Sequence, residues 1–229
     1  MSSATRSLTD LLSMFGGRRA PEPSHAAANV PPSAPAPTYP TKALGKFLKL
    51  LKAHDNPALI DLGPVVGPNV TFFGEQLGCR IRVEDVAADI ERHIKENKAD
   101  ALAKFFESRF AQEAESVDGI LCWDVLDFLD RPAANALARS LTHILRPDGA
   151  LLAFFNTAEA KAQIYTKYIV ADHSTLHYKT YPSARSRPRV LLNRDIIKMF
   201  EGLRVTDSFL MKNNVREILF RKPAYLAGR

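Results

Sequence analysis

The sequence predicts an α/β fold, built on a doubly wound, mostly parallel sheet that ends in an antiparallel hairpin. Short apolar runs alternate along the chain with segments in which apolar residues recur at helical spacing. This alternation is typical of parallel strands joined by crossover helices. Near the end of the chain it stops, and Asn213 and Asn214 separate two consecutive strand-like runs. Because asparagine tolerates positive φ, this pair indicates a two-residue hairpin turn.

The individual elements follow from periodicity and from turn residues. Leu44, Phe47, Leu48 and Leu51 lie at helical spacing, and a helix over them ends near Asn56. The segment 98–116 is ambiguous. We expect further helices at 69–77, 87–97, 132–145 and 195–200, and strands at 58–63, 80–85, 118–123, 150–155, 203–212 and 215–222.

The first forty residues have a different composition from the others. Seven of the 15 prolines lie between residues 21 and 40, among Ala and Ser. Such a segment cannot bury enough apolar surface to offset the entropy lost on ordering. We therefore expect a flexible N-terminal tail and Pro/Ala-rich linker over 1–40, followed by one domain over 41–225. The apolar positions of 8–15 have helical spacing, which indicates either a short partner- or membrane-touching helix or a mostly disordered tail.

Composition excludes several classes of protein. A chain of 229 residues with 46% hydrophobic residues can form one well-packed domain plus a tail. Its longest apolar runs fall far short of the roughly 20 residues that a membrane-spanning helix needs. The two cysteines, Cys79 and Cys122, suggest neither a disulfide framework nor a zinc site, and the histidines lack metal-ligand spacing. We expect a reducing, cytoplasmic location and no metal.

The basic charge of the chain is local. The segment 161–194 contains seven basic residues and one acidic residue, so it accounts for the whole net charge of +6. Interleaved tyrosines suit phosphate contacts combined with stacking on bases. One interpretation is that Arg185, Arg187 and Arg189 bind an acidic or nucleic-acid partner. The other is a solvated loop that pairs with the acidic helix around 85–96.

A candidate ligand site follows the first two strands of the domain. In open α/β sheets, ligands bind beyond the carboxyl ends of the strands. Asp61, Gly63 and Gly67 form a glycine-containing turn there, and glycine lets a ligand approach the backbone closely. Glu84 ends the next strand, with Asp85 beside it, at a spacing at which an acid holds the two hydroxyls of a ribose. The sequence therefore predicts a site for a nucleoside-containing cofactor.

These residues resemble the class I S-adenosylmethionine-dependent methyltransferases. In that family the first strand ends in an acidic residue followed by glycines at alternating positions, as at Asp61, Gly63 and Gly67. Segments 118–129 and 145–152 are similar to the family's fourth strand with its loop and to the turn into its fifth strand. The resemblance covers about 41–223 and implies a Rossmann-like sheet, S-adenosylmethionine as cofactor and methyl transfer to an acceptor. It implies these cofactor-binding residues: Asp61, Gly63, Val65, Gly67, Glu84, Asp85, Trp123 and Asp124.

Val65 departs from the family pattern, because it stands where the middle glycine is expected. A β-branched side chain resists positive φ and would occupy the space through which the methionine part of the cofactor passes. Either the loop follows another path, or cofactor binding is weakened or lost. Two hypotheses stay open. The chain is a methyltransferase for an undetermined acceptor, which 161–194 covers, or it is an inactive methyltransferase-like scaffold that binds a partner or acidic polymer through 161–194. Trp123 either lines the methionine end of the pocket or is a core aromatic residue.

Overall fold

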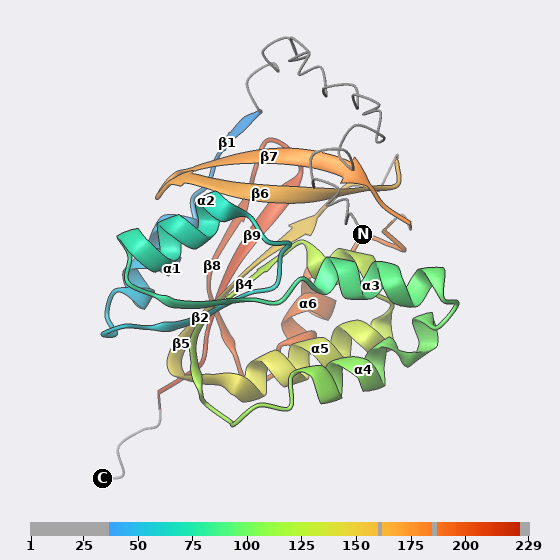
Figure 1. The fold of residues 1–229 in the computed structure, drawn as a ribbon, viewed down its shortest axis with the longest axis horizontal. Helices are drawn as coiled ribbons and strands as arrows, with labels where there is room; N and C mark the ends of the chain where they lie inside the picture. The colour runs from blue at the N-terminus through green and yellow to red at the C-terminus, as the bar shows by residue number, and fades with distance from the viewer. Residues whose placement is uncertain (1–36, 160–161, 185–186, 225–229) are drawn as a thin grey trace, which may run out of the picture. The chain divides into compact units, whose positions relative to one another are not determined.

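The computed structural model describes residues 37–159, 162–184 and 187–224. These residues form two sheets, one of six strands in the order β3-β2-β4-β5-β9-β8 and one of three in the order β1-β7-β6 (Figure 1). The strands are β1 (Thr38–Pro40), β2 (Ala58–Asp61), β3 (Arg80–Val83), β4 (Val117–Trp123), β5 (Leu145–Asn156), β6 (Ile164–Asp172), β7 (Thr175–Pro182), β8 (Arg204–Leu210) and β9 (Val215–Arg221). The α-helices are α1 (Leu44–Leu51), α2 (Gly67–Val70), α3 (Val86–Lys95), α4 (Leu102–Arg109), α5 (Arg131–Ile144) and α6 (Asn193–Met199).

The larger sheet confirms the predicted topology. Strands β3, β2, β4 and β5 run parallel to their neighbours, and β9 and β8 close the sheet with antiparallel pairing. Asn214 has a φ of 60° in the turn between β8 and β9, as the Asn-Asn pair predicts. Asp61, the last residue of β2, pairs with Val83 and with Leu121, so the carboxyl ends of β3, β2 and β4 meet at one edge.

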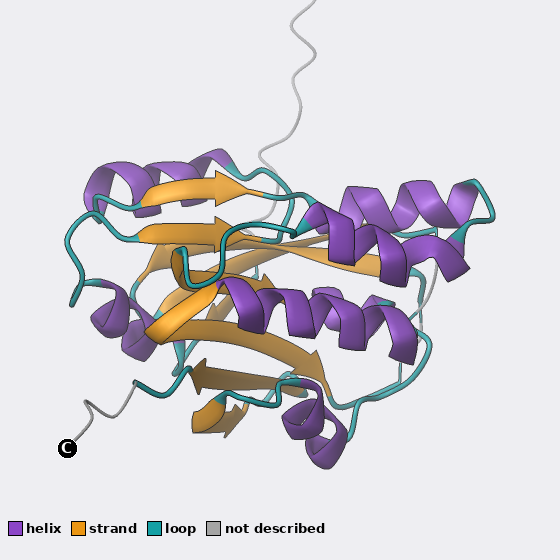
Figure 2. Ribbon diagram, turned by 90° about the horizontal axis from the view of Figure 1, so that it is seen from below, coloured by secondary structure: helices purple, strands orange, loops and turns teal. Residues whose placement is uncertain are grey.

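Helices cover both faces of the larger sheet, and Figure 2 shows them on both sides of the strands. Side chains alternate between the faces along each strand. Leu151 packs in the core beneath α3 to α6, while Leu152 packs in the core on the other face, together with Phe47 and Leu48 of α1. This alternation gives the doubly wound arrangement. Both cysteines are buried as free thiols, and burial raises the pKa of Cys122.

Several segments differ from the sequence-based expectations. The ambiguous segment 98–116 contains α4, preceded by a 3-10 turn (Ala99–Ala101). The expected helix at 69–77 begins as α2 and continues as a π-helix over Thr71–Gln76. Residues 38–40, expected in the tail, form β1 against β7. The rest of the tail lies outside the described residues, so its flexibility and its amphipathic segment stay predictions.

The largest difference is the β6–β7 hairpin, which lies in the basic segment 161–194, where the sequence indicated no strand. Its strands pair antiparallel from Ile164 with Pro182 to Asp172 with Thr175, and the hairpin lies across one end of the larger sheet (Figure 1). Tyrosine, isoleucine, valine and threonine are frequent in 164–170, and these residues favour strands. Within the described ranges, no helix is both long enough and apolar enough to cross a membrane.

Candidate cofactor site

The turn after β2 is closed by a buried carboxylate. Asp61 Oδ1 accepts hydrogen bonds from the Gly63 amide (2.9 Å) and from Trp123 Nε1 (2.6 Å). Burial raises the pKa of Asp61 to about 6, and both hydrogen bonds oppose this rise because they stabilise the ionised form. Asp61 thus joins the carboxyl ends of β2 and β4 through its own side chain.

Trp123 fills the space next to Gly63. It is the last residue of β4, is 4% exposed and has a φ of 46°, an unfavourable value for a bulky residue. A Cβ atom at Gly63 would lie 2.8 Å from Trp123 Cδ1, so only glycine fits there. The indole stacks on Tyr168 of β6, with 5.2 Å between ring centroids and 9° between planes, and meets Phe154 edge-on. Trp123 is therefore both a core aromatic residue and a wall of the candidate site.

Val65 does not obstruct the turn, because the loop follows a path that needs no positive φ at this residue. Its side chain is 66% exposed, and its φ is not among the positive values. The described residues of the turn that line the adjacent cavity are Gly63, Pro64 and Val66. A Cβ atom at Gly67 would meet no atom within 4 Å. The path of the backbone thus turns the β-branched side chain outward, and no strain arises at Val65.

The two acids after β3 already have partners. Glu84 is buried, with Oε1 2.7 Å from Arg82 Nε and Oε2 paired with Arg109 Nη2. Asp85 is the N-cap of α3, where its side chain accepts a hydrogen bond from the Ala88 amide. Both carboxylate oxygens of Glu84, the residue expected to bind the ribose, are therefore paired with arginines. Arg109 comes from α4, in the segment that the sequence left ambiguous.

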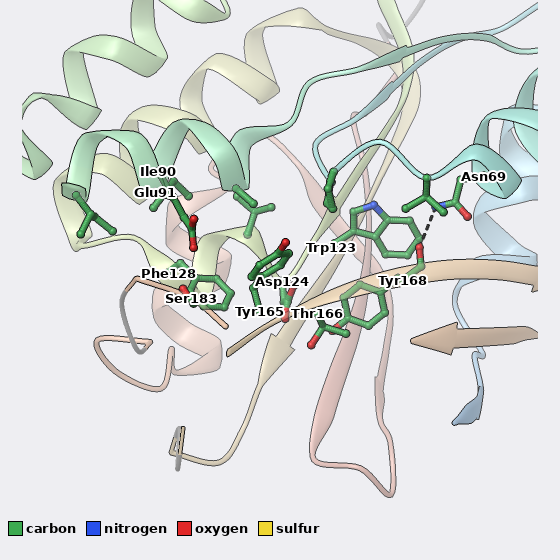
Figure 3. Close-up of a pocket in the computed structure, with 16 residues that line it drawn as sticks. Asn69, Ile90, Glu91, Trp123, Asp124, Phe128, Tyr165, Thr166, Tyr168 and Ser183 are labelled. Atoms are coloured by element: carbon green, nitrogen blue, oxygen red, sulfur yellow. Dashed lines mark hydrogen bonds between the residues drawn. The ribbon is translucent and has the colours of Figure 1, made fainter. Parts of the chain in front are cut away.

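A narrow cavity lies between the β2 turn, helix α3 and the β6–β7 hairpin (Figure 3). One wall of the cavity is apolar and consists of Ile90 and Ile94 of α3 together with Phe128. The cavity is also lined by Trp123, Asp124 and Tyr168. Its volume of about 40 Å³ is far below the roughly 300 to 1,000 Å³ of ligand pockets. The residue types suit a nucleoside-containing cofactor, but such a cofactor does not fit into this arrangement.

Asn69 ties the β6–β7 hairpin to the start of α2. Its Nδ2 donates to the Tyr168 carbonyl oxygen (2.9 Å) (Figure 3). Its Oδ1 accepts from the Val170 amide (2.8 Å). At the other end of the cavity, the Ala184 amide donates to Glu91 of α3 (3.1 Å). The sequence contains no signal for the role of Asn69, because its partners lie about a hundred residues away.

Two buried carboxylates follow β4. Asp124 comes directly after the strand, and Asp127 lies in the 3-10 turn Val125–Phe128. Burial raises the pKa of Asp124 to about 6 and that of Asp127 to about 7, and the charge of Asp124 adds to the second shift. The Asn156 amide and Nδ2 both donate to Asp127 Oδ2, and the Tyr168 hydroxyl hydrogen-bonds to Asp124. Sequence reasoning identified Asp124 but missed Asp127.

Arg187 points into the molecule, whereas we expected it on an exposed basic surface. Its side chain is 18% exposed, and Nη1 lies 4.0 Å from Asp127 Oδ2. Its positive charge opposes the rise in the pKa of both buried aspartates. Arg189 is exposed, and Arg185 lies outside the described residues. Arg187 therefore neutralises buried charge, while binding of an acidic or nucleic-acid partner stays a prediction.

No protein-family model and no curated protein sequence matches the chain. Its fold is similar to solved structures at low sequence identity. The 1,6-didemethyltoxoflavin-N1-methyltransferase of Burkholderia thailandensis, solved with S-adenosylhomocysteine, is 14% identical over 79% of this chain and 78% of that chain, with a TM-score of 0.45. The [4+2]-cyclase SpnF is 12% identical over 80% and 81%, with a TM-score of 0.48. The CcbJ methyltransferase from Streptomyces caelestis is 14% identical over 78% and 93%, with a TM-score of 0.46.

Proposed function

We propose that the chain is a class I S-adenosylmethionine-dependent methyltransferase that acts on an undetermined acceptor. One observation supports this most directly: the three segments that the sequence assigns to the cofactor lie together. The turn after β2, the acids after β3 and the Trp123–Asp124 pair all stand at the carboxyl ends of adjacent parallel strands. This edge is where α/β sheets of this kind bind ligands.

The residues present suit parts of such a cofactor. The apolar side chains of Ile90, Ile94 and Phe128, which line the cavity, would pack against a purine ring. Glu84 is not among the lining residues, and it would accept hydrogen bonds from ribose hydroxyls once an arginine releases it. When bound, S-adenosylmethionine supplies a methyl group on a sulfonium sulfur. Transfer of that group depends mainly on positioning of the acceptor, so an acid–base pair is not required in the sequence.

Binding requires the site to open, because the cavity is too small in the arrangement described above. We propose that Trp123 leaves the face of Gly63 and that Glu84 releases at least one of its two arginines. This movement of Trp123 would break its stacking on Tyr168 of β6. The equilibrium between the closed and open forms then lowers the apparent affinity for the cofactor.

Isothermal titration calorimetry of the full chain with S-adenosylhomocysteine tests this function. We expect saturable binding that Glu84→Gln weakens about tenfold, because the amide lacks the charge that strengthens the ribose hydrogen bonds. Glu107→Gln is the matched control, since Glu107 is an exposed partner of Arg139 on α5. Absence of heat at ligand concentrations of about 1 mM would contradict the proposal and leave the inactive scaffold as the interpretation.

A further inference from the structure

A second cavity lies beside the candidate cofactor site, beneath the β6–β7 hairpin. Its volume is about 160 Å³, and it shares Asp124, Thr166 and Tyr168 with the narrower cavity next to Gly63. We call it the tyrosine cavity. Its walls include Tyr39, Phe154, Tyr168, Tyr178, Asp124 and Arg187.

The size and the aromatic walls of the tyrosine cavity suit one small ring. An engineered apolar cavity of about 150 Å³ takes up benzene, so 160 Å³ is enough for a ligand of this size. Tyr39 of β1 and Tyr178 of β7 lie with their ring centroids 4.4 Å apart, and their hydroxyls are hydrogen-bonded at 2.6 Å. The faces of such rings attract cations as well as apolar groups.

The charges around the tyrosine cavity do not balance. Asp124 lines it, and Arg187 is the one cationic side chain among the described residues that line it. Asp127 is not a lining residue, but it is buried within reach of the Asp124 charge. Asp127 Oδ1 is buried without a hydrogen-bond partner among the described residues. A third carboxylate, Glu217, also lines the cavity, although its Oε2 accepts from the Lys42 and Ala43 amides at the start of α1. A buried carboxyl group is either protonated or needs a compensating charge, and a cationic ligand would supply that charge to ionised Asp124.

We propose that the tyrosine cavity binds a compact ligand in which a protonated amine is attached to an aromatic or apolar body. The amine pairs with Asp124, and the body lies among Tyr39, Phe154 and Tyr178. Because Asp124 also lines the cavity beside Gly63, the amine nitrogen would face the cofactor. This part rests on the proposed function, and it names amines as the class of methyl acceptor. Before transfer the ammonium group would give one proton to the Asp124 carboxylate. The freed nitrogen lone pair would then form the bond to the methyl carbon as the carbon–sulfur bond breaks.

Three ligands of nearly equal size test the proposal on the natural full-length protein. Benzylamine is a cation, benzyl alcohol is neutral and benzoate is an anion, so calorimetric titrations at pH 7.5 separate charge from shape. We expect benzylamine to bind about tenfold more tightly than benzyl alcohol, and benzoate to bind least. The proposal is wrong if benzoate binds most tightly, if the amine and the alcohol bind equally, or if none of the three binds.

Asp124→Asn tests the residue that we assign to the amine. The amide keeps the size of the side chain but removes its charge, so benzylamine should lose its preference over benzyl alcohol. Glu107→Gln makes the same change of charge at an exposed position and should keep the preference. If Asp124→Asn keeps the tenfold preference, Asp124 does not bind the amine. Circular dichroism confirms that each variant folds, and the ligand series on the natural protein needs no variant.

A titration with S-adenosylhomocysteine on the same protein separates the two proposals. Binding of S-adenosylhomocysteine without benzylamine keeps the methyltransferase function and refutes the amine as acceptor class. Binding of benzylamine without S-adenosylhomocysteine keeps the amine site and refutes the methyltransferase function.

Discussion

Trp123→Phe tests whether the Trp123–Asp61 contact closes the candidate site. The substitution keeps an aromatic ring against Tyr168 and Phe154 but removes the indole N–H, whose 2.6 Å hydrogen bond reaches a buried carboxylate. A hydrogen bond to a charged group stabilises a protein by about 1.5 to 3 kcal/mol. We therefore expect the free energy of unfolding, from urea denaturation, to fall by about 2 kcal/mol.

The same variant should bind the cofactor more tightly. In the natural protein, opening the site breaks the Trp123–Asp61 hydrogen bond and costs about 2 kcal/mol. The variant lacks this bond in the closed form, so its opening is easier by the same free energy. Calorimetry should then show an affinity for S-adenosylhomocysteine that is about 30-fold higher. Unchanged stability together with unchanged affinity would refute this role of Trp123.

Val65→Ala is the control for this experiment, because residue 65 lies in the same turn but its side chain is 66% exposed. We expect a change in stability within about 0.5 kcal/mol and no gain in affinity. A large gain in cofactor binding would restore the earlier expectation that Val65 closes the site.

Three further predictions concern the carboxyl edge of the sheet, and urea denaturation measures each. In the folded protein the pKa of Asp127 is about 7, against an ordinary value of 3.8. The natural protein therefore loses stability as the pH rises from about 4 to about 7. Asp127→Asn removes this ionisation and should flatten the pH dependence of the free energy of unfolding. The variant should also be more stable than the natural protein at pH 8. An unchanged dependence of stability on pH would contradict this reasoning. Asn69→Ala should lower the free energy of unfolding by about 3 kcal/mol, because two backbone groups of β6 lose their hydrogen-bond partner. A decrease below about 1 kcal/mol would show that the hairpin does not depend on Asn69. Gly63→Ala should lower the free energy of unfolding by about 2 kcal/mol, because the new Cβ atom would clash with Trp123. Gly67→Ala should change it by no more than about 0.5 kcal/mol, because the space around its Cβ atom is open. Equal effects at the two glycines would refute the close packing of the indole.

Patterns that repeat over a few residues predicted most of the fold. The apolar run before Asp61, the helical spacing from Leu44 to Leu51 and the Asn213–Asn214 turn each depend on neighbours in the chain, and each gave an element of the expected type. The position of the candidate site followed as well, because parallel strands align their carboxyl ends whatever their side chains are. The sequence did not indicate the hairpin at 164–182, because the basic charge of 161–194 favours a solvated loop or a partner-binding segment. Its β-branched and aromatic residues nevertheless favour strands.

By itself the sequence determined the class of fold, the edge of the sheet that carries the candidate site and the residue types gathered there. Only the tertiary structure decided what those residues do. Glu84 meets Arg109, Trp123 meets both Asp61 and Tyr168, and Val65 turns outward. Local propensity acts within one element, whereas these contacts join residues from different elements, and their geometry depends on how the elements pack. The sequence indicated an exposed basic residue at Arg187. In the folded protein the packing places its charge next to two buried aspartates, Asp124 and Asp127.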